Sequence, residues 1–121
     1  MSNAAQAYAR TSHASSSPRE IEAQALLKAA RQLQEVQTNW TGPGKHMDDA
    51  LLFNRRLWSI FMSAASAVEN QQPLEVRQNI ANIGVFVMKQ TVEMQINPDP
   101  AKLKSLIDIN CNLAAGLAGR G

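Results

Sequence analysis

Apolar residues recur every three to four positions along most of the chain, which is the spacing of amphipathic α-helices. Local signals mark where the helices begin and end. The run SPRE from Ser17 combines an N-cap serine, a proline at the first helical position and a glutamate three residues after the cap. The run TGPG from Thr41 and the pair Asn97-Pro98 interrupt the pattern. Together these signals predict four helices, over about residues 18–38, 47–68, 73–96 and 100–119.

The same pattern predicts the fold class and the domain organisation. No stretch alternates between apolar and polar residues as a strand would, and no segment repeats. Four helices of about 20 residues joined by short loops predict an all-α fold, an antiparallel bundle of about four helices. Residues 1–16 are rich in Ser and Ala, so we expect a mobile N-terminal leader with a short helix near Ala4–Ala9. Residues 17–121 are expected to form one helical domain.

Two asparagines interrupt apolar helix faces. On a helical wheel Asn54 lies in the middle of the apolar face of the second helix, and Asn110 lies near the centre of the fourth helix's apolar face. A buried amide without a partner costs about 1–3 kcal/mol, so each asparagine needs a hydrogen bond. We expect structural polar pegs that fix helix register, bonded to each other or to a backbone carbonyl. A direct functional contact is the alternative.

The third helix has two apolar stripes instead of one. The first contains Val76, Ile80, Ile83, Val87 and Met94, and the second contains Leu74, Ala81, Val85, Met88, Val92 and Ile96. Two apolar faces indicate either a central helix packed on both sides or a helix that keeps one face for a partner. In a domain of this size the central position is favoured. Exposure of Val85, Met88 and Val92 would instead favour the partner face.

Composition narrows the class of protein. The chain has 121 residues, 45% of them hydrophobic and 18% charged, which is typical of one ordinary globular domain. Cys111 is the only cysteine, so an intramolecular disulfide and a cysteine-based metal site are excluded. The first residues have no apolar core of signal-peptide length, and no window is apolar enough to span a membrane. We therefore expect a cytoplasmic protein.

Catalytic and cofactor-binding patterns are not found. His13 and His46 have no second ligand at metal spacing, and the Gly-Pro-Gly-Lys run lacks the spacing of a phosphate-binding loop. The Cys111 thiol is expected to be passive. The sequence thus predicts a protein that is not an enzyme and needs no cofactor or metal. The net charge of +2 is spread along the chain, so RNA binding requires packing to gather the basic residues, among them Arg55, Arg56, Arg77, Lys102 and Lys104.

Four segments, taken in order, resemble the FlaF family of alphaproteobacterial flagellar biosynthesis regulators. They are SPREIEAQALLKAARQLQ, the pair ALL and RLW in the second helix, PLEVRQNIANIGVFVMKQT, and LIDINCNLAAGL. The resemblance spans Ser17 to Leu117. One departure is Cys111, where family members commonly carry a basic residue, which puts in doubt any partner contact made by that residue.

The resemblance implies a small helical, non-enzymatic regulator required for flagellin synthesis or secretion, acting alongside the regulator FlbT. Combined with the spare apolar face, it suggests that the protein binds flagellin as an export chaperone, with a flagellin helix lying in an apolar groove. The expected contact residues are Arg56, Trp58, Val85, Met88 and Val92. The alternative is post-transcriptional control of flagellin, by RNA contact or in a complex with FlbT. Pairing of two copies through the spare face also stays open.

Overall fold

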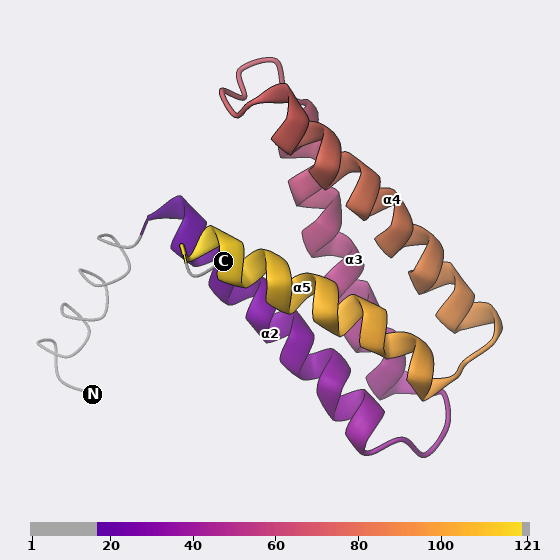
Figure 1. Ribbon diagram of the computed structural model, residues 1–121. Helices are drawn as coiled ribbons and strands as arrows, with labels where there is room; N and C mark the ends of the chain where they lie inside the picture. Colours follow the sequence, from indigo (N-terminus) through magenta and orange to yellow (C-terminus); the bar gives the residue numbers. More distant parts are fainter. Residues whose placement is uncertain (1–16, 120–121) are drawn as a thin grey trace, which may run out of the picture.

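The computed structural model describes residues 17–119, and these residues form four α-helices and no strand (Figure 1). The helices are α2 (Pro18–Thr38), α3 (Lys45–Ser66), α4 (Leu74–Ile96) and α5 (Leu103–Leu117), and the short 3-10 helix η1 (Pro100–Lys102) leads into α5. The all-α fold predicted from the sequence is therefore confirmed. The N-terminal leader and the short helix expected near Ala4–Ala9 lie outside the described residues.

Side-chain caps place the helix ends. The Ser17 hydroxyl accepts a hydrogen bond from the Glu20 N–H at 3.2 Å, and such a cap is worth about 1 kcal/mol. Helix α3 ends two residues earlier than expected because Asn70 folds back, donating from Nδ2 to the Ala64 carbonyl at 2.7 Å. The Asp99 carboxylate accepts from the Ala101 N–H at 2.9 Å at the start of η1. A polar side chain therefore satisfies a backbone group at the start of α2, at the end of α3 and at the start of η1, whereas α3 begins at Gly44 without a side-chain cap.

The chain runs up and down as two antiparallel helix pairs (Figure 1). Helix α2 packs along α5, helix α3 packs along α4, and α2 also contacts α3, whereas α4 and α5 touch at few points. The two pairs lie close together near the α2–α3 and α4–α5 connections and diverge toward the opposite end, where α2 begins and α5 ends (Figure 1). The bundle is open at that end.

Helix α4 is an edge helix, so the favoured central position was wrong. Its buried side is narrow and consists of Gly84, Val87, Thr91 and Met94. In a four-helix arrangement each helix faces two neighbours, and the divergence of the pairs removes most of the contact between α4 and α5. Most of the second apolar stripe of α4 is consequently left uncovered by the described residues, although Ala81 and Met88 are half-buried.

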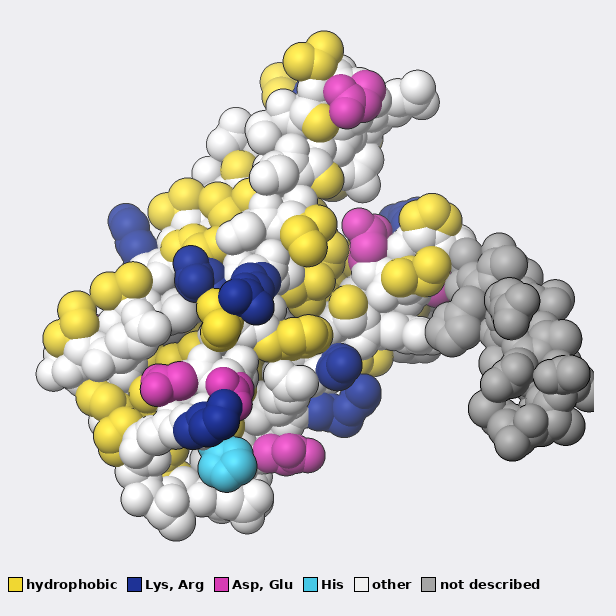
Figure 2. All heavy atoms as spheres, turned by 180° about the vertical axis from the view of Figure 1, so that it is seen from behind, with side chains coloured by type: hydrophobic (Ala, Val, Ile, Leu, Met, Phe, Trp, Pro, Cys, Tyr) yellow, Lys and Arg dark blue, Asp and Glu magenta, His cyan; other side chains and the backbone are white. Residues whose placement is uncertain are grey.

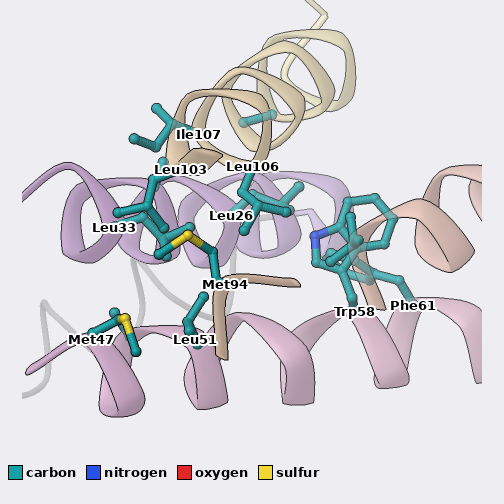
Figure 3. Packing of buried hydrophobic residues seen from close by; sticks show 14 of the residues in the cluster. Leu26, Leu33, Met47, Leu51, Trp58, Phe61, Met94, Leu103, Leu106 and Ile107 are labelled. Carbon is teal, nitrogen blue, oxygen red and sulfur yellow. The ribbon is translucent and has the colours of Figure 1, made fainter. Parts of the chain in front are cut away.

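The core lies where the helix pairs converge (Figure 3). Leucines of α2 and α5 interdigitate, and Met94 reaches from α4 between side chains of α2 and α3 (Figure 3). Burying one such side chain stabilises the fold by about 1.5–3 kcal/mol. The largest fully buried apolar side chains are Trp58, Leu26, Leu33, Leu51, Met94, Leu103, Leu106 and Val87.

Gly84 sets the approach of α4 to α3. A Cβ atom built on Gly84 would lie 2.5 Å from both Cγ and Sδ of Met62 on α3. Real Cβ atoms do not come this close to a neighbour, so a side chain at position 84 would require the Met62 side chain to move. The glycine is thus explained by helix packing.

Candidate functional site

Three buried polar side chains form a chain of hydrogen bonds between α3 and α5. The Trp58 indole nitrogen donates to Oδ1 of Asn110 at 3.0 Å, and Nδ2 of Asn110 donates to Oδ1 of Asn54 at 2.7 Å. A longer bond of 3.5 Å runs from Asn110 Nδ2 to the Leu26 carbonyl of α2. All three side chains have zero exposure. The two asparagines therefore contact each other, one of the two arrangements expected, and tie together three helices.

This network is one acceptor short. Asn54 Nδ2 is buried without a hydrogen-bond partner among residues 17–119. The cause is the indole of Trp58, which can only donate, so Asn110 must present its oxygen to Trp58 and its amide nitrogen to Asn54. Asn54 must then present its oxygen to Asn110, which leaves its own nitrogen without an acceptor. Such a group costs about 1–3 kcal/mol.

Trp58 is a core residue and not a partner contact, contrary to the expectation from the sequence. Its side chain is completely buried, and its ring packs edge-on against Phe61 with centroids 5.6 Å apart. The indole N–H reaches its acceptor Asn110 only inside the core. No face of Trp58 is available to another molecule in this structure.

A different surface on α4 is exposed and apolar. We call it the α4 face and define it as Leu74, Val85, Met88, Val92 and Ile96. Val85 is 46% exposed and Val92 50%, while Met88 is half-buried. Figure 2 shows hydrophobic side chains along the edge of the molecule that α4 forms. The three candidate contact residues of α4 thus lie on one face, and that face is accessible.

The open end of the bundle contains a small cleft that the sequence did not reveal. We call it the open-end cleft; its volume is about 180 Å³. All four helices and the α3–α4 loop contribute to its lining, which is Glu22, Phe61, Ala64, Ala65, Asn70, Gln72, Ile80, Leu113 and Leu117. Figure 2 shows a hollow with hydrophobic walls where the start of α2 and the end of α3 diverge. Six of these nine residues are apolar, so the cleft is a surface suited to an apolar occupant.

Among the described residues, Glu22 is the only ionisable one that lines this cleft. Burial against the apolar walls raises the pKa of its carboxyl group above 4.5, and the positive charge of Arg19 partly opposes the shift. A signal for this site was present in the sequence, because Glu22 falls within the apolar arc of α2 on a helical wheel. A carboxylate at such a position indicates either that this end of the helix is exposed to solvent or that the residue lines a binding site.

A second hollow of about 580 Å³ lies between the end of α2 and the start of α3. Its walls mix apolar side chains such as Trp40 and Phe53 with the Gly-Pro-Gly loop and the charged pair Lys45 and Asp49, which bond to each other at 2.9 Å. His46 lines the hollow together with the acidic residues Glu35 and Asp49, but no group of three His, Cys, Asp or Glu side chains in the described part of the chain could hold a metal ion. We find no convergent set of reactive groups in this hollow.

The comparison with protein families decides the identity. The chain matches the family model described as flagellar protein FlaF over residues 4–117. It belongs to the FlaF family. The match begins at residue 4, which is 13 residues before the domain start expected at residue 17. It therefore includes most of the segment predicted to be a leader. Searches of curated proteins and of solved structures found no match.

Two of the five basic residues considered for RNA contact in this FlaF-family chain form ion pairs with acidic side chains. Lys104 pairs with Asp108 at 2.6 Å, and Lys102 pairs with Glu93 at 3.4 Å and also donates to the Asn97 carbonyl at 2.8 Å. Arg55 and Arg56 are exposed on α3 and form no ion pair with another described residue. Arg77 is half-buried on α4. Two of the five residues considered for RNA contact therefore each lie beside an acidic side chain.

Two further features of the FlaF-family chain bear on the site. Cys111 is exposed on α5, so its thiol is accessible to solvent although it stands in a largely apolar helix. Among the helices of residues 17–119, none is both long and apolar enough to cross a membrane.

Proposed function

We propose that this FlaF-family protein binds flagellin in the cytoplasm as an export chaperone, and that a flagellin helix lies against the α4 face. The observation that carries the proposal is the exposure of large apolar side chains along α4, where Leu74 is 70% and Ile96 is 67% exposed. Exposed residues of this kind on one helix are typical of interaction surfaces. Family membership supplies the flagellar context.

The physical basis is helix-in-groove recognition. Val85, Met88 and Val92 are separated by three and four residues, so they lie in a line along one side of α4. An amphipathic helix with apolar residues at the same spacing would cover this line. Each of these side chains is already partly covered, so burying it contributes less than the 1.5–3 kcal/mol, roughly, of a fully exposed residue. A complex of moderate affinity is expected, suited to release of flagellin at the export apparatus.

Arg56 supports the proposal as a charged residue outside the apolar face. It is exposed on α3 and is free of ion pairs within the described residues, so an acidic group of a partner could bind it. Such a rim contact accelerates association more than it tightens the complex. Arg56 is therefore assigned a secondary role.

RNA contact, alone or together with FlbT, is the alternative, and Arg55 and Arg56 are the residues that favour it. Binding of RNA through these side chains would weaken steeply as salt increases, because counterions are released from the phosphates. Binding through the α4 face would change little with salt, since it depends on apolar contact. The salt dependence therefore separates the two mechanisms.

The decisive experiment is co-purification with the cognate flagellin after nuclease treatment, comparing two valine-to-aspartate variants. Val92→Asp places a charge in the middle of the α4 face, whereas Val68→Asp changes a residue of the α3–α4 loop that is 98% exposed. We expect Val92→Asp to weaken flagellin binding at least tenfold, roughly the effect of losing 1.4 kcal/mol, and Val68→Asp to leave it unchanged. Circular dichroism controls for folding. Loss of the complex on nuclease treatment, or equal binding by both variants, would overturn the proposal.

A further inference from the structure

The open-end cleft is an uncovered apolar surface with one carboxylate. Phe61, Ile80, Leu113 and Leu117 line it from three helices, and Glu22 lines it from α2. The described residues offer Glu22 no ion pair. A carboxylate with apolar neighbours is stabilised when a cation approaches it. The complementary occupant is therefore a short apolar segment that carries a positive charge and no negative one.

The chain's own residues 4–16 have this chemistry. Their sequence is AAQAYARTSHASS, which has four alanines and one tyrosine among the six residues before Arg10 and contains no Asp or Glu. Tyr8 supplies a ring that can cover an apolar wall while its hydroxyl stays in water. The family match includes residues 4–16, so this segment is part of the FlaF domain and not an unrelated extension.

The point where this segment joins the bundle places it beside the cleft. Ser17 caps the first turn of α2, and Glu22 lies about one turn further along the same helix. The seven residues from Arg10 to Ser17 span up to about 25 Å when extended. Arg10 can therefore reach Glu22, and Tyr8, two residues earlier, can reach the walls formed by α3 and α5.

We propose that residues 4–16 fold back over the open-end cleft, with Tyr8 and its neighbouring alanines against the apolar walls and the Arg10 guanidinium beside the Glu22 carboxylate. The segment then joins the two helix pairs at the end where they diverge. It leaves the α4 face free, so this contact and flagellin binding are independent of each other. The two proposals can therefore fail separately. Flagellin binding can be normal in a protein whose residues 4–16 do not dock, and docking can be normal in a protein that does not bind flagellin.

Tyr8 is the only tyrosine of the chain, which allows a specific test. Full-length protein grown with 3-fluorotyrosine gives a single fluorine NMR signal, and a synthetic peptide of residues 2–16 with the same label gives the position of an undocked ring. We expect the signal of the full chain to be displaced from that of the peptide. Glu22→Arg should move it toward the peptide position, and the matched variant Glu35→Arg, on the same helix but away from the cleft, should not.

A charge reversal tests the pair itself. Arg10→Glu should also move the signal toward the peptide position, and combining it with Glu22→Arg should restore the displacement. Leu117→Asp, which puts a charge on the cleft wall, should release Tyr8 while circular dichroism shows the helices retained. A wild-type signal at the peptide position would overturn the proposal. So would a displacement that grows with protein concentration, since that indicates docking on a second copy.

Discussion

The indole nitrogen of Trp58 and Oδ1 of Asn110 lie 3.0 Å apart inside the core, and this single bond orients every other amide in the network. Because the indole can only donate, the hydrogen bonds run in one direction, from Trp58 through Asn110 to Asn54. The last donor in the chain, Nδ2 of Asn54, has no acceptor among the described residues. The three side chains therefore contribute unequally to stability.

Asn110 is predicted to matter more than Asn54. Replacing Asn110 with Leu leaves the Trp58 N–H and the Asn54 oxygen without partners, so we expect the free energy of unfolding to fall by about 2–4 kcal/mol. Asn54→Leu removes the donor that is already unsatisfied, while Asn110 keeps its longer bond to the Leu26 carbonyl. A loss of about 1 kcal/mol or less is expected. Urea unfolding of both variants measures the difference; an equal or larger loss for Asn54→Leu contradicts the direction of the network.

Trp58 and Asn110 should be energetically coupled. In a double-mutant cycle, Trp58→Phe removes the donor and Asn110→Leu removes its acceptor, while the edge-on contact of the aromatic ring with Phe61 is retained in outline. The loss of unfolding free energy caused by Trp58→Phe should be about 1 kcal/mol smaller in the Asn110→Leu background than in the wild-type protein. Chemical denaturation of the four proteins provides the value. Simple additivity of the two substitutions would show that the bond contributes nothing.

Gly84 and Gly116 should respond to alanine in opposite directions. A Cβ on Gly84 would overlap Met62, whereas a Cβ on Gly116, also within a helix, would meet no atom within 4 Å. Gly116→Ala should stabilise the protein by about 0.5–1 kcal/mol through its higher helix propensity. Gly84→Ala should destabilise it by about 1–3 kcal/mol, as overpacking does. Thermal unfolding tests both.

Shortening the neighbouring side chain serves as the rescue. In the Met62→Ala background, Gly84→Ala should lose its destabilising effect because the overlapping atoms are gone. Persistence of the full loss in that background would assign the role of Gly84 to backbone conformation instead of helix approach.

Folding stability should depend on pH through Glu22. Burial raises the pKa of its carboxyl group above 4.5 in the folded protein. The folded state therefore binds the carboxyl proton of Glu22 more tightly than the unfolded state does. The stabilisation that this difference provides is complete at low pH and is lost as pH rises from about 4.5 through the folded-state pKa. In Arg10→Gln, which lacks the proposed partner cation, Glu22→Gln should raise stability at neutral pH and have no effect below pH 4, approximately.

The measurement is urea unfolding at several pH values, supported by the carboxyl carbon shift of Glu22. Glu35→Gln, at an exposed position on the same helix, is the matched control. A titration midpoint of Glu22 below 4.5 in the Arg10→Gln variant would contradict the effect of burial.

The positions of the helices could be read from the sequence because short-range interactions decide them. The Ser17 hydroxyl bonds to a backbone N–H only three residues away, and Asp99 caps a turn two residues away. The placement of Asn54 and Asn110 within apolar arcs was predictable for the same reason, since helical geometry alone sets the direction of each side chain. Both are buried, as that geometry implied.

Only the tertiary structure decided which apolar faces are covered. A helical wheel locates a side chain around its own axis but does not say which neighbour lies opposite. Trp58 is therefore completely buried instead of in contact with a partner, and α4 lies at an edge with Val92 exposed. The divergence of the two helix pairs, which depends on contacts between residues far apart in the chain, creates the cleft beside Glu22. Long-range packing, which no local pattern encodes, decided those features.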